Sequence, residues 1–424
     1  MRDGSIRTDR AVISAAPQAA TTPPEPGVSI SYGKSFPQRS PSPRLDSVDI
    51  LRGIVMVVMA LDHVRDYFTE VRFDPLDLSH TTVAYALTRW LTHYCAPVFV
   101  FLAGTGAFLS LSRGKTPKDL SRYLLTRGIW LVFLELTWVR FGWFFNLDYS
   151  FAIGQVIWAI GWSMIVLSSL VSLSPVVIAG LGCGMILLHN AADGIDPGRL
   201  GIFGWPWQIL HAGGPIAYLP GEVFVAVYPL IPWIGVMAAG FGFGKVLLLE
   251  EQSRRRVLLR LGIGLIVGFV VLRLTNLYGD PHPWQAQNNP AFTILSFIKC
   301  EKYPPSLLYL LMTIGPAITL MALLERWKGR GSTFFLTFGR VPFFYYMLHI
   351  PLIHGFAVLA AYLTGYNPSF MFGNTPPWMW PEGYGFSLPV VYGVWIGTVL
   401  LLYPLCVWFA GVKRRRKDAW LSYL

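Results

Sequence analysis

Charged residues and paired cysteines are what this sequence has least of. Only 13% of its 424 residues are Asp, Glu, Lys or Arg, whereas soluble proteins carry about a quarter, and this excludes an ordinary soluble domain. The four cysteines are scattered; none has a CxxC or zinc-ligand spacing, and three lie in apolar runs. This pattern argues against a disulfide framework, and the sequence predicts no metal site.

Apolar segments, in contrast, recur from one end of the chain to the other. Hydrophobic residues make up 54% of the sequence, and the longer runs reach the roughly 20 residues that a membrane-crossing helix needs. We therefore predict an all-α, polytopic membrane protein with about 10 transmembrane helices. The predicted spans are 47–68, 88–112, 123–145, 151–173, 175–190, 224–249, 257–277, 305–324, 333–363 and 387–412. The ninth is long enough to tilt or to break.

Basic residues give the chain a formal net charge of +11, but their placement indicates membrane orientation and not nucleic-acid binding. The basic clusters are 113–122, 254–256, 326–330 and 413–417. Ten spans would put all of them on one side, so both termini are predicted to be cytoplasmic. The opposite loops, 191–222 and 278–304, are long and rich in Pro, Gly and Trp. Either they cover a ligand, or their aromatic residues form an interfacial belt.

Two flanking segments are predicted outside the spans. Residues 1–43 lack an apolar period and are rich in Pro, Ser and Ala, so we expect a disordered cytoplasmic tail and no cleaved signal peptide. Residues 44–412 would form the transmembrane domain, and residues 413–424 a basic cytoplasmic C-terminus. The glycine-rich stretch at 235–245 is predicted to pack helices closely. Small-residue faces in the second and sixth spans permit a homodimer.

Ionisable residues interrupt the first apolar run at Asp62, His63, Arg65 and Asp66. Helical spacing lets Asp66 meet both Asp62 and His63. Charges at membrane depth are costly, and a chain that keeps them there usually uses them. The second span begins with Arg89 and His93, four residues apart on one helical face. Because consecutive spans usually pack side by side, we expect the two patches to share one polar pocket toward the outer side.

This pocket is predicted to perform acid–base chemistry. His63 would be the general base or a transient acyl carrier, oriented by Asp62 or Asp66, because a carboxylate fixes the imidazole tautomer and stabilises its cation. Arg65 and Arg89 would balance the carboxylates or bind an anionic group. The alternative interpretation is that these side chains only snorkel to the interface or form structural ion pairs.

Other polar residues are weaker candidates. His93 is the second acid–base candidate, and the candidates for substrate binding are Arg273, Asn276 and His349. An intramembrane histidine such as His349 or His354 is as readily a satisfied core residue. Arg340 would meet a cytosolic anion such as a nucleotide phosphate, or it is an ordinary positive-inside anchor. Four histidines lie in loops or at span ends, and most of them are expected to be solvated: His80, His189, His211 and His282.

Four stretches carry a resemblance to a known family. They are RLDSVDILRGIVMVVMALDHVRDYF (44–68), RWLTHYCAPVFVFLAGTGAFLSL (89–111), YPLIPWIGVMAAGFGFGKVL (228–247) and FGRVPFFYYMLHIPLIH (338–354). The sequence resembles the bacterial branch of the heparan-alpha-glucosaminide N-acetyltransferase-like family over most of the chain after residue 43. The resemblance implies a multi-span helical fold, an acyl-CoA co-substrate such as acetyl-CoA, and transfer across a membrane, here the bacterial inner membrane.

Three functions follow as hypotheses. The first is an integral-membrane acyltransferase that moves an acyl group, acetyl by resemblance, from acyl-CoA to an extracytoplasmic sugar or glycan. The second is a proton-coupled transporter or exporter in which the Asp-His cluster relays protons. The third is a structural membrane subunit whose polar cluster only holds helices together. The first predicts a chemical product, the second proton-coupled uptake, and the third a loss of stability alone on Asp62→Asn.

Overall fold

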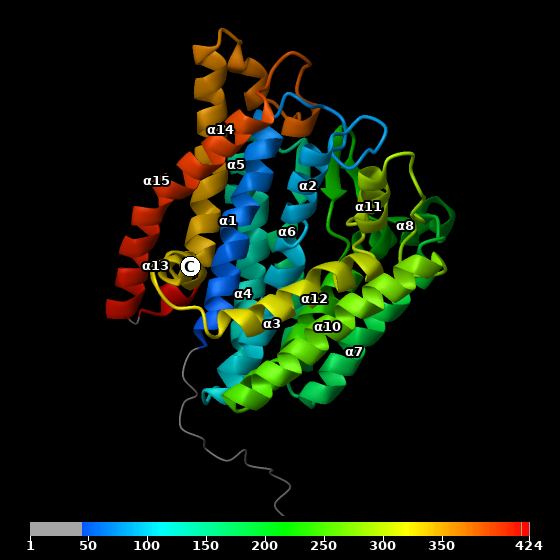
Figure 1. The fold of residues 1–424 in the computed structure, drawn as a ribbon. Coiled ribbons are helices and arrows are strands. Elements are labelled where there is room, and N and C mark those ends of the chain that lie inside the picture. The colour runs from blue at the N-terminus through cyan, green and yellow to red at the C-terminus, as the bar shows by residue number, and fades with distance from the viewer. Residues whose placement is uncertain (1–44, 417, 424) are drawn as a thin grey trace, which may run out of the picture. The chain divides into compact units, whose positions relative to one another are not determined.

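Long helices account for most of the computed structural model, which describes residues 45–416 and 418–423 (Figure 1). The predicted tail at 1–43 lies outside the described residues. The helices in the predicted spans are α1 (Asp46–Phe68), α2 (Val83–Thr92), α3 (Cys95–Ser112), α4 (Pro117–Leu134), α5 (Arg140–Phe144), α6 (Val156–Leu170), α7 (Pro175–Leu188), α9 (Leu230–Phe243), α10 (Glu251–Thr275), α12 (Leu307–Leu324), α13 (Arg330–Arg340), α14 (Pro342–Leu363) and α15 (Leu388–Arg415). Two shorter helices, α8 (Gly204–Trp207) and α11 (Pro290–Ile298), lie in the predicted outer loops.

Seven helical stretches in the described part of the chain are long and apolar enough to cross a membrane. They are Val83–Ser112, Pro175–Ala192, Leu230–Leu248, Glu251–Thr275, Leu307–Leu324, Pro342–Leu363 and Leu388–Arg415. The all-α polytopic class is therefore confirmed. The helix α6 is apolar but has only 15 residues, and α1 and α4 carry charged residues within their length. Ten spans with both termini on one side thus stay a prediction.

Several predicted spans are broken. The second divides at His93 and Tyr94 between α2 and α3, and the third continues α4 through a π-helix, η1 (Glu135–Val139), into α5. The ninth breaks at Val341, between α13 and α14. Pro342 follows this break as the first residue of α14, where its missing N–H costs nothing. Breaks of this kind turn side chains and backbone groups toward the bundle interior at membrane depth.

A small sheet replaces parts of two predicted spans. Its strands are β1 (Phe151–Gly154), β2 (Gly214–Leu219) and β3 (Glu222–Ala226), in the order β1–β3–β2. The pair β1–β3 is parallel, with Phe151 opposite Val223, and β2–β3 is antiparallel, with Gly214 opposite Ala226. The prediction that helices begin at 151 and 224 was wrong, because Val and Phe at alternate positions also suit a strand. The helices α6 and α9 follow these strands.

Glycines set the closest helix contacts. A Cβ atom at Gly339 on α13 would lie 1.7 Å from the Asp49 carbonyl oxygen of α1, and one at Gly53 would lie 1.8 Å from the Phe335 carbonyl oxygen. A Cβ at Gly240, in the glycine-rich stretch, would lie 2.1 Å from the Phe101 carbonyl oxygen of α3. Only glycine permits such an approach. The packing interpretation of the stretch 235–245 is therefore confirmed.

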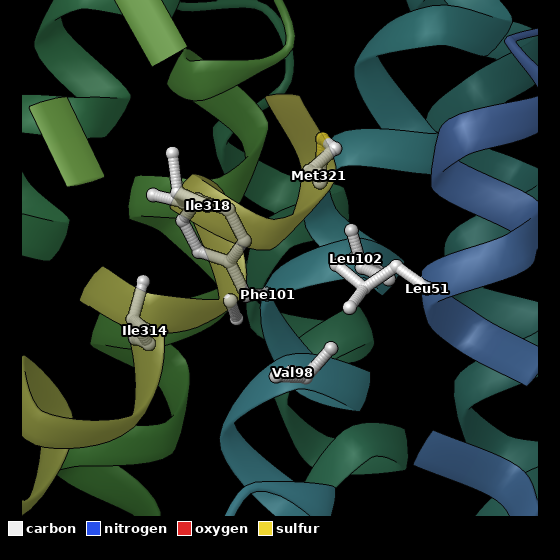
Figure 2. A pocket seen from close by; sticks show the side chains of 8 residues that line it. Leu51, Val98, Phe101, Leu102, Ile314, Ile318 and Met321 are labelled. Atoms are coloured by element: carbon white, nitrogen blue, oxygen red, sulfur yellow. The ribbon is translucent and has the colours of Figure 1, made fainter. Parts of the chain in front are cut away.

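The helix α1 packs against α3, α12, α13, α14 and α15, so its polar C-terminal half lies inside the bundle (Figure 1). Figure 2 shows one gap in this packing, a cavity of about 10 Å³ among α1, α3 and α12. Its lining is apolar throughout: Leu51, Val98, Phe101, Leu102, Ile314, Ala317, Ile318 and Met321. A space of this size holds at most one water and offers it no polar partner, so it is a packing gap and not a binding site.

Candidate active site

The two polar patches predicted on the first pair of spans meet at Asp62. Its carboxylate accepts hydrogen bonds from Arg89 Nη1 at 2.7 and 2.9 Å and from Thr92 Oγ1 at 2.8 Å. Arg65 Nη2 lies 3.0 Å from Asp62 Oδ1 and 2.6 Å from Asp66 Oδ1. Two arginines therefore neutralise two carboxylates between α1 and α2. Such pairing is what makes charges tolerable at this depth.

His63 points to a different set of partners. Its ring packs edge-on against Trp143 and tilted against His349, each with a centroid separation of 5.1 Å. Its Nδ1 is buried and has no hydrogen-bond partner within residues 45–416. The expected hydrogen bond from His63 to Asp62 or Asp66 is therefore absent at Nδ1, a correction to the predicted carboxylate–imidazole pair. The arginines take the carboxylates, and neighbouring positions on a helix face different directions.

His349 on α14 has a defined tautomer. Its Nδ1 lies 2.7 Å from the Tyr346 carbonyl oxygen, and a carbonyl can only accept, so Nδ1 carries the proton. The Nε2 atom then holds a lone pair. It is buried and has no partner in the part of the chain that the structure describes. His349 was predicted as a substrate-binding residue, but this arrangement is that of a base with an available lone pair.

An aromatic wall continues the site beyond His349. His354, one turn further on α14, donates from Nδ1 to the Gly142 carbonyl at 3.0 Å and stacks on Phe145 at a centroid separation of 3.8 Å. Tyr67 of α1 packs against His354 at 5.0 Å and donates its hydroxyl to the Trp143 carbonyl at 2.9 Å. The broken end of the third span thus supplies the ring face and the carbonyl that fix His354, and the Trp143 ring that packs against His63.

His93 lies at the break between α2 and α3, on the Arg89 side of the cluster. It is buried, and its ring packs edge-on against Tyr309 at 5.4 Å. The Tyr309 hydroxyl donates to the His93 carbonyl at 2.7 Å. His93 directly follows Thr92, whose hydroxyl donates to Asp62, whereas the ring contacts of His63 are with Trp143 and His349.

Lys302 is a site residue that the sequence analysis missed. It is buried at 6% exposure, its Nζ lies 5.0 Å from the centre of the Tyr303 ring, and its charge acts on Asp62, His63 and His93. Burial alone would raise the pKa of the Tyr303 phenol, but Lys302 and Arg89 outweigh it and lower that pKa. Lys302 lies in the predicted loop 278–304, where no hydrophobic periodicity indicates which residues are buried.

Arg273 and Asn276 do not serve the site. The buried Arg273 guanidinium donates to the carbonyls of Phe297, His282, Ser296 and Lys299. Asn276 exchanges two hydrogen bonds of 3.0 Å with the backbone of Trp284. Both side chains hold the loop 278–304, and their predicted role in substrate binding is corrected to a structural one. A buried arginine with four carbonyl partners has little capacity left for a ligand.

A larger cavity, of about 350 Å³, opens near the N-terminal half of α1. Its basic lining residues are Arg52, Arg127, Arg340 and Lys413. Its other lining residues include Met56 of α1, Ile157 of α6 and Tyr346 of α14. Arg340 is 41% exposed and lies 3.5 Å from Asp46, so a guanidinium remains accessible at this cavity. The cavity therefore joins basic residues at one end of the bundle to its middle.

The predicted solvation of four loop histidines is right for two of them. His80 and His282 have side chains that are each 66% exposed. His189 and His211 are only 5% and 2% exposed, so the expectation that most of the four are solvated holds for two of them only. The loop 191–222 folds back over the end of α7 and buries them together.

Seven helical stretches able to cross a membrane, among the described residues, define an integral membrane protein. A family model described as "Heparan-alpha-glucosaminide N-acetyltransferase, catalytic" matches residues 44–271. The match covers more than half of the 424 residues, so the chain belongs to this family of transmembrane acetyltransferases. A search of curated proteins finds no match. The matched region holds His63, Asp62 and Arg89 and ends before His349.

Proposed function

We propose that the protein transfers an acyl group, in the first place acetyl, from acyl-CoA on the cytoplasmic side to a sugar or glycan on the opposite side. The bacterial inner membrane is the proposed location. The observation that carries the proposal is the cavity that begins among basic residues and reaches Tyr346. Tyr346 lies one helical turn from His349, the imidazole with an available lone pair.

The basic end of this cavity suits the donor. Acyl-CoA carries several phosphate groups, and guanidinium groups bind phosphate through charge-assisted, bidentate hydrogen bonds. Arg340 would contact such a phosphate, as the sequence analysis proposed. The remaining lining includes Met56, Phe99 and Leu102, which would contact the less polar arm that ends in the thioester.

The imidazole pair suits the transfer step. A hydroxyl or amine of the acceptor attacks the thioester carbonyl carbon, and the carbon–sulfur bond breaks. His349 Nε2, or His63, takes the proton of the attacking group and returns it to the departing thiolate, so CoA leaves as the thiol. An imidazole with its other nitrogen fixed on a carbonyl, as in His349, is held in the tautomer for this role.

The charged residues are assigned supporting roles. Asp62, Arg65, Asp66 and Arg89 form a neutral framework that orients the outer half of α1. Lys302 and His93 lie on the outer side of that framework, where the acceptor would enter. Neutralised charges of this kind also keep a polar acceptor compatible with the bundle interior.

The test is transfer by purified, full-length protein in nanodiscs, with radiolabelled acetyl-CoA and a panel of amino sugars and glycans. The proposal predicts a labelled acceptor and release of free CoA thiol in equal amounts. Acyl-CoA species of longer chain, tested in parallel, would identify a different acyl group. If none of the donors reacts, and vesicles instead show solute uptake driven by a proton gradient, the transporter hypothesis replaces this one.

A further inference from the structure

We propose that His189, Asp193 and His211 form a binding site for a divalent transition metal, best suited to Zn²⁺. Each residue offers one ligand atom, and these atoms all lie within 4.8 Å of one another. The cluster lies at the end of α7 and in the predicted outer loop, and it includes no residue of the proposed transfer site. The inference therefore does not depend on the proposed function.

Local structure brings the three side chains together. A 3-10 helix, η2 (His189–Ala192), follows α7 directly and is capped by Asp193. A π-helix, η4 (Gln208–Ala212), carries His211 back to the same place. His211 Nε2 lies 3.1 Å from Asp193 Oδ1, and the two imidazole rings are 5.7 Å apart. No sequence spacing signals this site, because His211 lies on a separate segment of the loop.

Burial without hydrogen bonds is the observation that points to a ligand. His189 and His211 are more than nine-tenths buried. Within residues 45–416, none of their four ring nitrogens makes a hydrogen bond of good geometry, although the Pro305 carbonyl interacts with the His189 ring. Leaving buried polar atoms unsatisfied is costly. An ion pair between His211 and Asp193 would satisfy only one of these nitrogens, whereas a metal ion would satisfy one in each ring.

The surrounding residues hold the cluster in place. Asp193 Oδ2 accepts a hydrogen bond of 2.9 Å from Asn190 Nδ2, which leaves Oδ1 directed toward His211. Asn190 Oδ1 in turn accepts from the Leu307 amide at 2.9 Å. The Trp207 ring packs against His211 at 4.8 Å. Outer partners of this kind orient the ligands of metal sites in proteins.

The ligand set indicates the metal. Two imidazole nitrogens and one carboxylate oxygen are a common set for Zn²⁺, with a fourth position for water. Bonds of about 2 Å in a tetrahedral site place ligand atoms about 3.3 Å apart. The 3.1 Å pair already has that separation, and the wider pairs need a small inward movement. The bound metal would fasten the loop 191–222 to the end of α7.

The experiment uses full-length protein purified in detergent, stripped with chelator and titrated with ZnCl₂. Bound metal is counted by mass spectrometry after dialysis, and Co²⁺ absorption in the visible range reports tetrahedral coordination. We expect one saturable Zn²⁺ site per chain. His189→Ala and His211→Ala should each weaken binding by more than about 100-fold, because each removes a direct ligand. The thermal unfolding midpoint of the wild type should rise with Zn²⁺.

The matched control is His80→Ala. His80 lies 2.8 Å from Asp77 in a different loop, where its side chain is exposed, and this variant should keep full Zn²⁺ binding. Asp193→Asn serves as the third ligand variant, because it keeps the side-chain shape should either alanine variant fail to fold. The proposal is overturned if stripped wild-type protein shows no saturable site, or if folded Asp193→Asn binds Zn²⁺ as tightly as the wild type and the His80→Ala control. Both measurements are independent of acyl transfer.

Discussion

Two sets of polar groups meet at the C-terminal half of α1, and they differ in one respect. The carboxylates of Asp62 and Asp66 are paired with Arg65 and Arg89 at 2.6–3.0 Å. The imidazoles that meet beside them, His63 and His349, each keep a buried nitrogen without a partner among the described residues. The carboxylates already have cationic partners, although Arg65 Nη1 is buried without a hydrogen bond among the described residues, and we assign this set to the framework. Unpaired nitrogens have capacity left for a substrate, and this difference is why we propose that the histidines carry the chemistry.

The largest effect is expected from substituting the two imidazoles. His349→Gln or His63→Gln should reduce kcat by about 10²–10⁴-fold, the usual contribution of a general acid–base residue. Stability should change little, because glutamine keeps a polar group of similar size. Turnover of labelled acetyl-CoA and the thermal unfolding midpoint are measured side by side, with His80→Gln as the control. Full turnover in both variants would remove the imidazole pair from the mechanism.

A second test removes a carboxylate from the paired set. Asp62→Asn leaves Arg89 and Arg65 without their common partner, and breaking a buried ion pair costs about 3–5 kcal/mol of stability. We expect a lower unfolding midpoint, measured in detergent, and partial recovery in the double variant Asp62→Asn/Arg89→Gln. A variant of normal stability with no turnover would show that Asp62 takes part in the chemistry and is more than framework.

The third test concerns a charge that is only partly paired. Arg340→Gln should raise the KM for acyl-CoA about tenfold and leave kcat unchanged, since a lost uniform binding interaction of about 1.4 kcal/mol acts on KM alone. Arg326→Gln is the control, because Arg326 is exposed and lies outside the cavity lining. A fall in kcat at constant KM would place Arg340 in the transfer step and not in donor binding.

The smallest effect concerns an exposed carboxylate in the loop between α1 and α2. Hydrogen bonds from the Ser79 hydroxyl, His80 and the Ser79 amide hold the pKa of Asp77 well below its usual range. A lowered native pKa adds stability above the unfolded value of about 3.9, and this is lost as pH falls through the native pKa. The small stability deficit of Asp77→Asn should therefore shrink below about pH 4. A deficit that does not change with pH would contradict this.

Much of the helical architecture follows from the sequence, since spans of apolar residues and a basic-residue bias are local signals. The meeting of Asp62 with Arg89 was also predictable, because neighbouring spans pack together. The partner of His63 was not, since α14 returns to α1 only through tertiary packing. Lys302 and the His189–His211 pair lie in loops, where no period reports burial. The short strands at 151–154 and 222–226 were predicted to be helical because their residues are mostly apolar, as those of membrane spans are.

Glycine contacts determine how the cavity can change its width. Gly53 and Gly339 lock α1 to α13, and a Cβ at Gly128 of α4 would lie 2.6 Å from the Gly161 carbonyl oxygen of α6. These two pairs supply different parts of the lining, with Arg52 and Arg340 on one pair and Arg127 and Ile157 on the other. We expect each pair to move as a rigid unit. Entry of a bulky donor would then increase the distance between the two helix pairs and leave the packing within each pair unchanged.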